Sequence, residues 1–246
     1  MAADYPQTRT FELGNGVILE MVLIPAGTFM MGSPASEAER SRDETQHQVT
    51  ISKPFYLGKY PITQAQWQQV MVTNPSHSKG DKLLPVENIS WDVVQTFCLK
   101  LKEVTLSPFH IPSEAQWEYA CRAGTTTPYH FGNQLNGRQA NCDGTVPYGT
   151  DIEGPYLKKT SPVGKYPPNA WGLHGMHGNV CEWCLDWYGD YPIETVVDPS
   201  GPETGLFRVV RGGGWSFSAV GCRSAGRRGI IPSYRRIYLG FRIALS

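Results

Sequence analysis

Cysteine and histidine are the residue types in this chain best suited to metal or redox chemistry, and four of them lie close together in the sequence. Cys181 and Cys184 form a CxxC pair, and His174 and His177 precede it in the sequence HGMHG. Thiolates and imidazoles are the ligands that zinc favours, but a structural zinc site usually has a second CxxC or a suitably spaced histidine pair. The glycines around the two histidines favour a tight turn. We therefore interpret Cys181 and Cys184 as buried structural cysteines.

The C-terminal segment, Arg208–Arg242, is the most informative part of the chain. It reads RVVRGGGWSFSAVGCRSAGRRGIIPSYRRIYLGFR, with Cys222 as its single cysteine. The residues between Trp215 and Cys222 repeat neither every three or four positions, as in a helix, nor every two, as in a half-buried strand. A mixture of Tyr, Ser, Gly, Arg and Ile without periodicity is typical of a paratope. The segment therefore indicates a surface presented to a partner.

Composition sets the context for these residues. The chain has 246 residues, 40% of them hydrophobic and 11% aromatic, which is enough for a substantial core. Its 26 glycines and 19 prolines favour a loop-rich fold over a helical bundle. The net charge is zero, so bulk attraction to nucleic acid or an anionic membrane is not expected. No targeting signal or membrane span is recognisable, and six cysteines are too few for a disulfide scaffold, so we expect a cytoplasmic location with reduced thiols.

Three helices are predicted from capping residues and apolar spacing. Thr63 and Gln66 form a capping box for a helix over about 64–72. Ser90 is expected to cap a second helix, whose apolar stripe is Val94, Phe97, Cys98 and Leu101. Pro112-Ser113-Glu114-Ala115-Gln116 begins a third, which we expect Gly124 to end in a left-handed cap.

Strands are predicted where apolar and β-branched residues concentrate. They cover Val17–Ile24, His47–Ile51, Phe55–Lys59, Phe207–Arg211 and Leu239–Leu245. We expect the first and the last of them to pair and close the domain. Between Gly132 and Tyr166 the chain is mostly Gly, Asn, Asp, Pro and Thr, which predicts a long loop that is functional, ion-stabilised or held by its own side chains.

Six ordered motifs resemble those of the formylglycine-generating enzyme, or sulfatase-modifying factor, family. They are MVLIPAGTFMMGS at Met21–Ser33, YPITQAQW at Tyr60–Trp67, PVENISWDVVQTFC at Pro85–Cys98, PSEAQWEYACRAG at Pro112–Gly124, NAWGLHGMHGNVCEW at Asn169–Trp183, and RVVRGGGW with LGFR at the C-terminus. The resemblance implies an α+β protein with the formylglycine-generating-enzyme variant of the C-type lectin fold: small antiparallel sheets, few helices and much irregular structure. It also implies a single domain over residues 1–246, with a variable region at about 208–242.

The enzymes of this family resemble the chain in the RGG region, where they use two cysteines five residues apart to bind copper and oxidise a substrate cysteine. Cys222 matches the second of these, but Phe217 stands at the position of the first. A single thiolate does not make a two-sulfur site for Cu(I), which depends on soft ligands. The related oxidases with a histidine-rich helical domain are also a poor match, because that domain is missing here. Because the overall family resemblance remains, we keep a formylglycine-generating type of oxidase, acting on a substrate cysteine, as the alternative interpretation.

The segment resembles more closely the variable proteins of diversity-generating retroelements, a prokaryotic group with the same fold. In these proteins a fixed frame encloses hypervariable, ligand-binding positions. The frame carries over onto Arg208, Arg211, Gly212, Gly213, Trp215, Cys222, Arg223, Ser224, Ala225, Arg227, Arg235, Gly240, Phe241 and Arg242. The ligand-binding positions carry over onto Ser216, Phe217, Ser218, Val220, Gly221, Gly226, Arg228, Gly229, Ile230, Ile231, Ser233, Tyr234, Arg236, Ile237 and Tyr238. No Lys, Glu, Gln, Met or Trp follows Trp215, as expected if adenines alone vary in codons that end in a pyrimidine.

The physical properties of these fifteen positions also favour binding. Tyr234 and Tyr238 offer large amphipathic contacts at a low entropy cost. The aliphatic and aromatic members would form a partner-binding patch if exposed together, and Arg228 and Arg236 would orient a ligand through planar hydrogen bonding. The competing interpretation is that the apolar members are buried core.

Arginine dominates the charge of the segment. From Arg208 to Ser246 there are eight arginines and neither an acid nor a lysine, so nucleic acid is an alternative ligand. Most of these arginines occupy frame positions. We expect them to bind carbonyl groups and acids elsewhere in the chain, such as Glu182 or Asp186, rather than nucleic acid.

The family resemblance also implies two calcium sites. The first carries over onto Asn141 and Cys142, and the second onto Gly178, Val180 and Glu182. Oxygen ligands in an irregular loop suit calcium. The turn before the second site has Gly175 where the family has Asn or Asp, and a buried acid paired with a frame arginine is the alternative role for Glu182. We expect no required cofactor, with calcium as the candidate ion.

Together these features predict a noncatalytic ligand-binding protein with a hypervariable C-terminal surface. A protein ligand fits the surface better than a small molecule. The sequence names neither the ligand nor its affinity.

Overall fold

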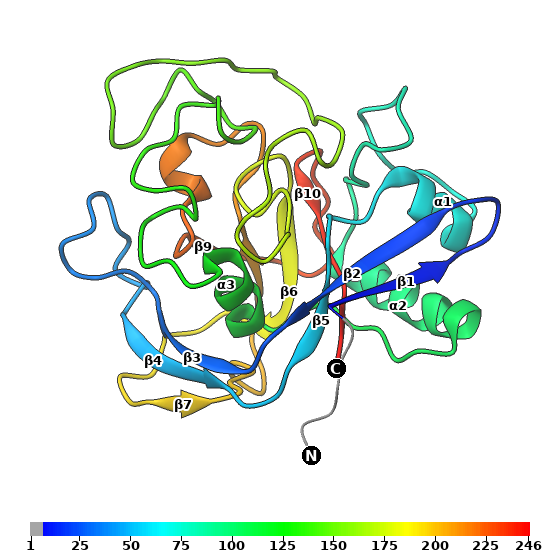
Figure 1. Cartoon of the computed structure of the whole chain (residues 1–246), viewed down its shortest axis with the longest axis horizontal. Helices are drawn as coiled ribbons and strands as arrows, with labels where there is room; N and C mark the ends of the chain where they lie inside the picture. Colours follow the sequence, from blue (N-terminus) through cyan, green and yellow to red (C-terminus); the bar gives the residue numbers. More distant parts are fainter. Residues whose placement is uncertain (1–6) are drawn as a thin grey trace.

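The structure is a computed structural model that describes residues 7–246 (Figure 1). Three α-helices lie in this part of the chain: α1 (Gln64–Met71), α2 (Trp91–Thr105) and α3 (Glu114–Arg122). Thr63 Oγ1 accepts a hydrogen bond from Gln66 N at 3.2 Å, and Gln66 Oε1 accepts one from Thr63 N at 2.9 Å. Ser113 and Gln116 form the same capping box at α3. The three predicted helices and both capping boxes are confirmed.

Two details of the helix ends differ from the prediction. The Ser90 side chain makes no capping hydrogen bond, and α2 starts instead with a backbone bond from Val94 N to Ser90 O at 3.1 Å. Helix α3 ends at Arg122, and its C-cap residue Ala123 takes the left-handed conformation with φ of 45°, one residue before Gly124. Gly124 also has positive φ, so the turn after α3 uses two left-handed residues rather than one.

The first sheet packs against α1 and α2. Its strands are β1 (Thr8–Glu12), β2 (Ile18–Ile24), β5 (Phe55–Gly58) and β11 (Ala244–Leu245), in the order β1-β2-β5-β11. The buried ring of Trp67 in α1 stacks on Phe97 in α2 at 5.2 Å, and Phe97 meets the edge of Phe241 at 5.2 Å. These rings share one core with Leu19 and Met21 of β2.

The second sheet contains the C-terminal segment. Its order is β10-β6-β8-β9, with β6 (Cys181–Trp187), β8 (Arg208–Arg211), β9 (Arg227–Ile230) and β10 (Leu239–Gly240). In Figure 1 the red C-terminal strand β10 lies beside the yellow strand β6. A 3₁₀-helix, Ala219–Cys222, precedes β9. Because β9 is last in the order β10-β6-β8-β9, it is an edge strand of this sheet.

The third sheet has the order β3-β4-β7, formed by β3 (Gly27–Met31), β4 (His47–Ile51) and β7 (Val196–Val197). This sheet packs against α3 through contacts such as that between Phe29 and Tyr119, whose ring centres lie 5.1 Å apart. The β4–β7 and β10–β6 pairs are parallel, so the second and third sheets are mixed, whereas the first sheet is antiparallel as predicted.

The predicted closing strand is divided in two. Within Leu239–Leu245, β10 joins the second sheet and β11 the first, because Phe241 O and Ile243 O accept bonds from Ile62 N and Gly58 N. The expected pairing of the first and last strands is also wrong. Strand β2 and strand β11 lie on opposite sides of β5, where Leu57 pairs with residues of both.

Residues 123–180 are irregular, as predicted for the Gly-rich loop, and contain only turns, bends and isolated bridges. Glycine allows backbone segments to approach closely here. A Cβ atom at Gly154 would lie 2.0 Å from Asn136 O, and one at Gly144 would lie 2.4 Å from the same oxygen. Asn136 Nδ2 also donates to Ile152 O at 2.9 Å. The loop is thus held by its own backbone and side chains.

Candidate binding surface

None of the fifteen residues predicted to face a ligand is buried. Five of them are exposed and ten are partly exposed; the exposed ones are Arg228, Ile231, Ser233, Tyr234 and Arg236. Most of the frame is buried instead, namely Arg211, Gly212, Gly213, Cys222, Arg223, Ser224, Ala225, Arg227, Gly240, Phe241 and Arg242. The fixed and irregular residues of the sequence therefore correspond to the interior and the surface of the fold.

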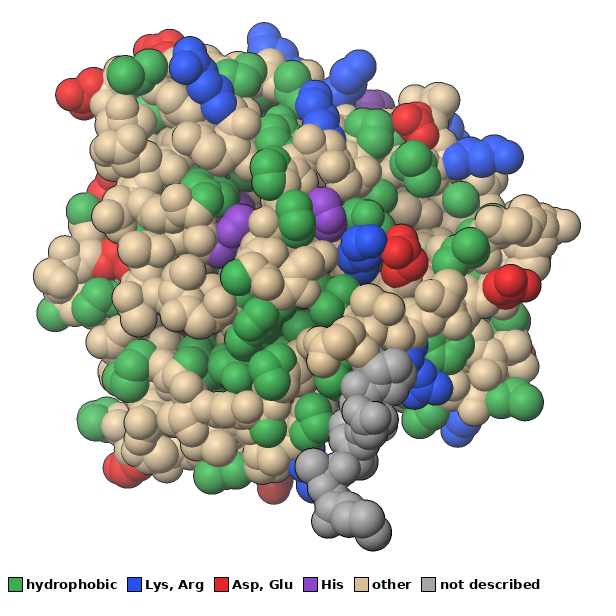
Figure 2. Space-filling model, in the orientation of Figure 1, with side chains coloured by type: hydrophobic (Ala, Val, Ile, Leu, Met, Phe, Trp, Pro, Cys, Tyr) green, Lys and Arg blue, Asp and Glu red, His purple; other side chains and the backbone are tan. Residues whose placement is uncertain are grey.

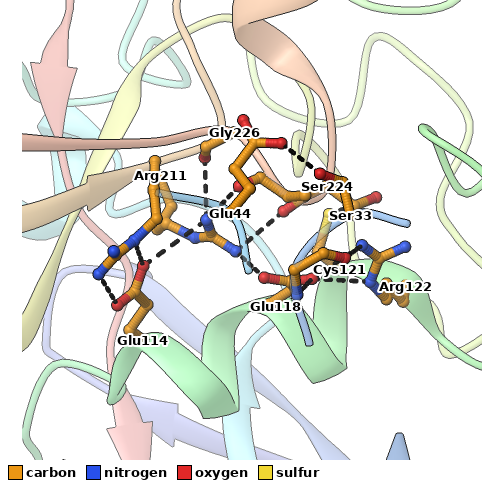
Figure 3. Close-up of polar contacts among 12 residues, drawn as sticks. Ser33, Glu44, Glu114, Glu118, Cys121, Arg122, Arg211, Ser224 and Gly226 are labelled. Atoms are coloured by element: carbon orange, nitrogen blue, oxygen red, sulfur yellow. Dashed lines mark hydrogen bonds and ion pairs between the residues drawn. The ribbon is translucent and has the colours of Figure 1, made fainter. Parts of the chain in front are cut away.

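Arg211 on β8 holds the turn that leads into β9 (Figure 3). Its Nη1 atom donates to Ala225 O at 2.8 Å and Gly226 O at 3.0 Å, and Nη2 donates to Ser224 O at 2.9 Å. Nη2 also forms an ion pair with Glu118 of α3. A guanidinium group has five donors in a fixed plane, so one buried side chain fixes three successive carbonyl groups.

Arg242 confirms the expectation that frame arginines pair with acids. Its Nε and Nη2 atoms bind Glu182 at 2.7 and 2.8 Å, and the other donors bind the carbonyl groups of Gly58 and His174. Both Arg242 and Glu182 are fully buried. Asp186, the other expected partner, accepts the Glu114 backbone N–H at 2.7 Å instead.

Arg223 and Arg227 tie the segment to distant acids. Arg223 is bidentate on Glu44, with distances of 2.7 and 2.9 Å, and Arg227 is bidentate on Glu114, with both distances 2.8 Å. Burial acts to raise the pKa of Glu44, but the hydrogen bond and charge of Arg223 outweigh it and hold that pKa below its ordinary value. The Arg223–Glu44 pair holds loop 34–46 against the segment, and the Arg227–Glu114 pair holds α3 against it.

Two frame arginines behave differently. Arg208 stacks between the rings of Trp91 and Trp187, at 3.9 and 3.5 Å from their centres, and donates to Leu185 O. Arg235 was predicted to be part of the fixed frame, but its side chain is exposed and forms no ion pair with the described residues. The expectation that frame arginines bind acids is therefore wrong for Arg235, which lies in the exposed loop after β9.

A groove of about 790 Å³ runs through the middle of this surface. Ten of the fifteen predicted residues line it: Phe217, Val220, Gly221, Gly226, Arg228, Gly229, Ile230, Ile231, Tyr234 and Tyr238. Its volume is in the range of pockets that bind ligands. The other five lie outside the groove, and one of these, Ile237, lines a neighbouring cavity of about 520 Å³ with Trp215 and Lys158.

The opposite wall of the groove was not predicted. It consists of Glu39, Ser41, Asp43 and Glu44 from loop 34–46, together with Tyr188 and Phe207. The Tyr188 hydroxyl donates to Asp43 Oδ2, and burial followed by this hydrogen bond raises the pKa of Tyr188 to about 12. Phe207 is 40% exposed and directly precedes β8, which is the one local signal that could have indicated its role.

Aromatic and cationic groups pack against one another in the wall of the groove that the predicted ligand-binding residues form. The rings of Phe217 and Tyr238 meet edge to face at 5.1 Å, and Arg228 lies over Phe217 at 4.8 Å from the ring centre. Arg236 lies over Tyr234 at 3.8 Å. The competing interpretation as core holds in part, because Phe217, Ile230 and Tyr238 also pack against the main core. Ile231, with 51% exposure, does not.

The cysteines and histidines form no zinc site. All six cysteines are free and buried, and no three His, Cys, Asp or Glu residues within 7–246 are placed to hold a metal ion. His174 and His177 are used in hydrogen bonds to Tyr166 O and Cys222 O. The pKa of Cys222 is raised well above its ordinary value. The hydrogen bond with the Cys142 thiol is the larger cause, and burial is the second. The structure thus brings a second thiol to Cys222 from a distant segment.

The two sets of expected calcium ligands differ in how well they fit an ion. Asn141 Oδ1 is buried and has no hydrogen-bond partner among the described residues, so it is suited to a hard cation. Glu182 is not, because both of its carboxylate oxygens bind Arg242 and one also accepts from Trp117 Nε1 at 2.7 Å. Glu182 therefore has its alternative role of a buried acid. The second set, with Gly178 and Val180, loses its only charged ligand.

Residues 10–246 match the family model described as sulfatase-modifying factor enzyme 1-like domain. The chain belongs to this family. It is 29% identical to the formylglycine-generating enzyme of Thermomonospora curvata, over 98% of this chain and 97% of that enzyme. It is also 28% identical to the serine/threonine-protein kinase pkn1 of Chlamydia pneumoniae, and there it spans only 38% of the relative's length.

Two solved structures are similar over nearly the whole chain. Treponema denticola variable protein 1 has a TM-score of 0.84 and 28% identity, covering 98% of this chain and 99% of that one. PvdO from Pseudomonas aeruginosa has a TM-score of 0.82 and 29% identity, covering 99% and 100%. The predicted α+β fold, with the C-type lectin architecture of a variable protein, is confirmed.

The distribution of surface charge and the length of the helices are the features relevant to nucleic-acid binding and to a membrane span. In Figure 2, acidic and basic side chains are scattered over the face shown, and neither sign covers a large area. No helix among residues 7–246 is long and apolar enough to cross a membrane.

Proposed function

We propose that this protein is a noncatalytic binding protein that takes a protein ligand on its variable C-terminal surface. The observation that carries the proposal is the separation of the segment into buried frame and exposed irregular residues. Ten of the fifteen irregular residues line a single groove. The frame is fixed by ion pairs such as Arg211–Glu118 and Arg242–Glu182, so exposed residues such as Arg228 and Ser233 can change without breaking these pairs.

The likeness to Treponema denticola variable protein 1 supports the same function. Large aromatic groups and planar guanidinium groups, as found in this groove, are enriched where binding energy concentrates in protein interfaces. The surrounding DNA offers a direct test of the hypervariable character. We expect a near-identical repeat of the segment, differing only at adenines, beside a reverse-transcriptase gene. A segment that is identical in many isolates would contradict it.

Display selection tests the binding surface. A library that randomises Arg228, Ile231, Ser233, Tyr234 and Arg236 is displayed and selected on purified lysozyme. The matched control library randomises five exposed residues elsewhere: Val72, Leu99, Leu106, Ile152 and Ile193. We expect binders with submicromolar Kd from the first library only. Equal yields from the two libraries would show that the groove is not a privileged binding surface.

One observation favours the alternative, an oxidase acting on a substrate cysteine, because Cys142 supplies a second thiol to Cys222. Both thiols are buried, however, and the raised pKa of Cys222 disfavours the thiolate that soft metals require. A cysteine peptide incubated with the protein, copper and oxygen should remain unmodified by mass spectrometry. Oxidation of the peptide that Cys142→Ser abolishes would support the oxidase instead.

A further inference from the structure

Strand β9 forms an open edge within the groove. It is the last strand in the order β10-β6-β8-β9, and it pairs with β8 alone. Every residue from Gly226 to Ile231 lines the groove. Because successive side chains of a strand point to opposite faces of the sheet, a groove that touches all of them runs along the edge of the strand rather than over one face.

The hydrogen-bonding groups at this edge follow from the register. Tyr188 N donates to Phe207 O at 2.8 Å, so the peptide groups of Phe207 face β6. Since these groups alternate along a strand, those of Arg208 and Val210 face β9. Their register partners are Ile230 and Arg228. Gly229 lies between these two, and its N–H and C=O therefore point away from β8 into the groove.

The side chains at this edge leave room for another strand. Gly229 has no side chain, and the Tyr188 ring and Phe207 Cβ fill the position that a Cβ atom would take on one face of the sheet, so neither extends from Gly229 towards an added strand. Apart from bonds within the β8–β9 ladder, Gly229 N and O make no backbone hydrogen bond with the described residues. An edge strand with unpaired N–H and C=O groups is a template for pairing with another chain. Strand addition of this kind is a common mode of peptide recognition.

Charge indicates the chemistry of the added strand. Arg228, Arg235 and Arg236 are exposed, and none of them forms an ion pair with a described residue. Arg228 and Arg236 are stacked on Phe217 and Tyr234, which leaves their planar donor groups oriented but free of acids. A carboxylate is the side chain that such a guanidinium group binds best.

We propose that the open edge of β9 binds an extended, acidic segment of the partner protein by strand addition. The partner backbone pairs with Gly229, its carboxylates bind Arg228 and Arg236, and its apolar side chains lie against Ile231. This inference rests on the proposed binding function and specifies its ligand. A strand of four residues spans about 13 Å, so a hexapeptide is long enough to occupy the edge.

A synthetic hexapeptide that alternates Glu and Val, carrying a fluorophore, tests the proposal with the full-length protein. We expect saturable binding by fluorescence anisotropy and slowed hydrogen exchange at the Gly229 amide. The same peptide with an N-methyl group on every residue cannot donate to the edge, and it should bind at least tenfold more weakly. A peptide with Lys in place of Glu should also bind at least tenfold more weakly.

Arg228→Glu should reverse this charge preference, whereas Arg138→Glu, an exposed arginine outside the groove, should leave it unchanged. Equal binding of the N-methylated peptide, or no binding of any peptide, would overturn strand addition. Stronger competition by a single-stranded oligonucleotide than by the acidic peptide would overturn the choice of ligand. Lysozyme binders selected from the display library would still support the proposed function in each of these cases.

Discussion

At the scale of single residues, arginine has two opposite roles in the C-terminal segment. Arg242 is fully buried and binds Glu182, Gly58 O and His174 O, whereas Arg228 is exposed and binds no acid among the described residues. A buried charge that loses its partner is costly, whereas a change in an exposed side chain is usually nearly neutral. The frame arginines are therefore structural, and the exposed ones are available to a ligand.

Arg242→Met should lower the free energy of unfolding by about 3 to 5 kcal/mol, because it leaves the Glu182 carboxylate buried and unpaired. The matched variant Arg228→Met should change it by less than about 0.5 kcal/mol. Urea unfolding monitored by tryptophan fluorescence measures both. Similar losses for the two variants would contradict the distinction between frame and surface.

Glu87 is a buried acid whose ionisation opposes folding. Its side chain is fully buried, Oε1 accepts from Ser78 N at 2.7 Å, and Oε2 has no partner among the described residues. Burial raises the pKa of Glu87 to about 7, above its ordinary value of 4.5. The folded state therefore binds the proton more tightly than the unfolded state. Stability from this group is complete below pH 4.5 and is lost as the pH rises through 7.

Glu87→Gln should remove this dependence, since the amide stays neutral. Relative to the wild type, the variant should gain about 2 to 3 kcal/mol of stability between pH 5 and pH 8. Urea midpoints at the two pH values give the comparison. A difference between variant and wild type that does not vary with pH would show that Glu87 is not the titrating group.

At the scale of elements, the helices could be predicted from local sequence signals. The pairing of strands into sheets could not. Helices α1 and α3 start at capping boxes, which are encoded within four residues. Strand β9, with sequence RRGI, has no alternation of apolar and polar residues, and it is a strand because β8 pairs with it. Likewise, the division of Leu239–Leu245 between two sheets depends on partners from β6 and β5.

The part of the candidate site that lies in the C-terminal segment could be predicted from the sequence, and the part contributed by other segments could not. Frame and surface positions lie within one continuous segment, so their pattern is visible in the sequence. The opposite wall comes from loop 34–46, Tyr188 and Phe207, and the second thiol comes from Cys142. Only the folded chain places these residues beside the segment. Arg235 lacks the acid partner expected of a frame arginine for the same reason, because ion pairing depends on neighbours that are distant in sequence.

Within β9, Gly229 should tolerate substitution least among the fifteen positions. A Cβ atom there would lie 2.9 Å from the Tyr188 ring and 3.0 Å from Phe207 Cβ. Gly229→Ala should therefore cost about 1 to 3 kcal/mol of stability through overpacking. Ser233→Val, at an exposed position, should be nearly neutral. In a thermal-unfolding double-mutant cycle, Tyr188→Ala should reduce the cost of Gly229→Ala; strictly additive effects would contradict the contact.

At the scale of the whole molecule, ion pairs connect the two ends of the chain. Loop 34–46 follows the N-terminal strands, and Arg223 of the C-terminal segment binds Glu44 and Glu37 of this loop. Arg227 Nη1 also donates to Asp43 O at 3.3 Å. The loop forms one wall of the groove, so the shape of the binding surface depends on contacts between segments that are far apart in sequence.

Arg223→Met should therefore release the loop before it unfolds the domain. Without the guanidinium group, Glu44 keeps only Ser33 Oγ at 2.8 Å as a side-chain partner, and a buried carboxylate favours opening to water. Arg42 in the loop is exposed, so trypsin cleavage after it should become at least tenfold faster once the loop opens. Cleavage after Lys100 and Lys102 of α2 should accelerate less, which separates loop opening from global unfolding. Arg236→Met, which removes an exposed arginine from the same segment, should leave cleavage after Arg42 unchanged. Equal acceleration at the loop and at α2 would mean that Arg223 stabilises the whole domain and does not specifically hold the wall of the groove.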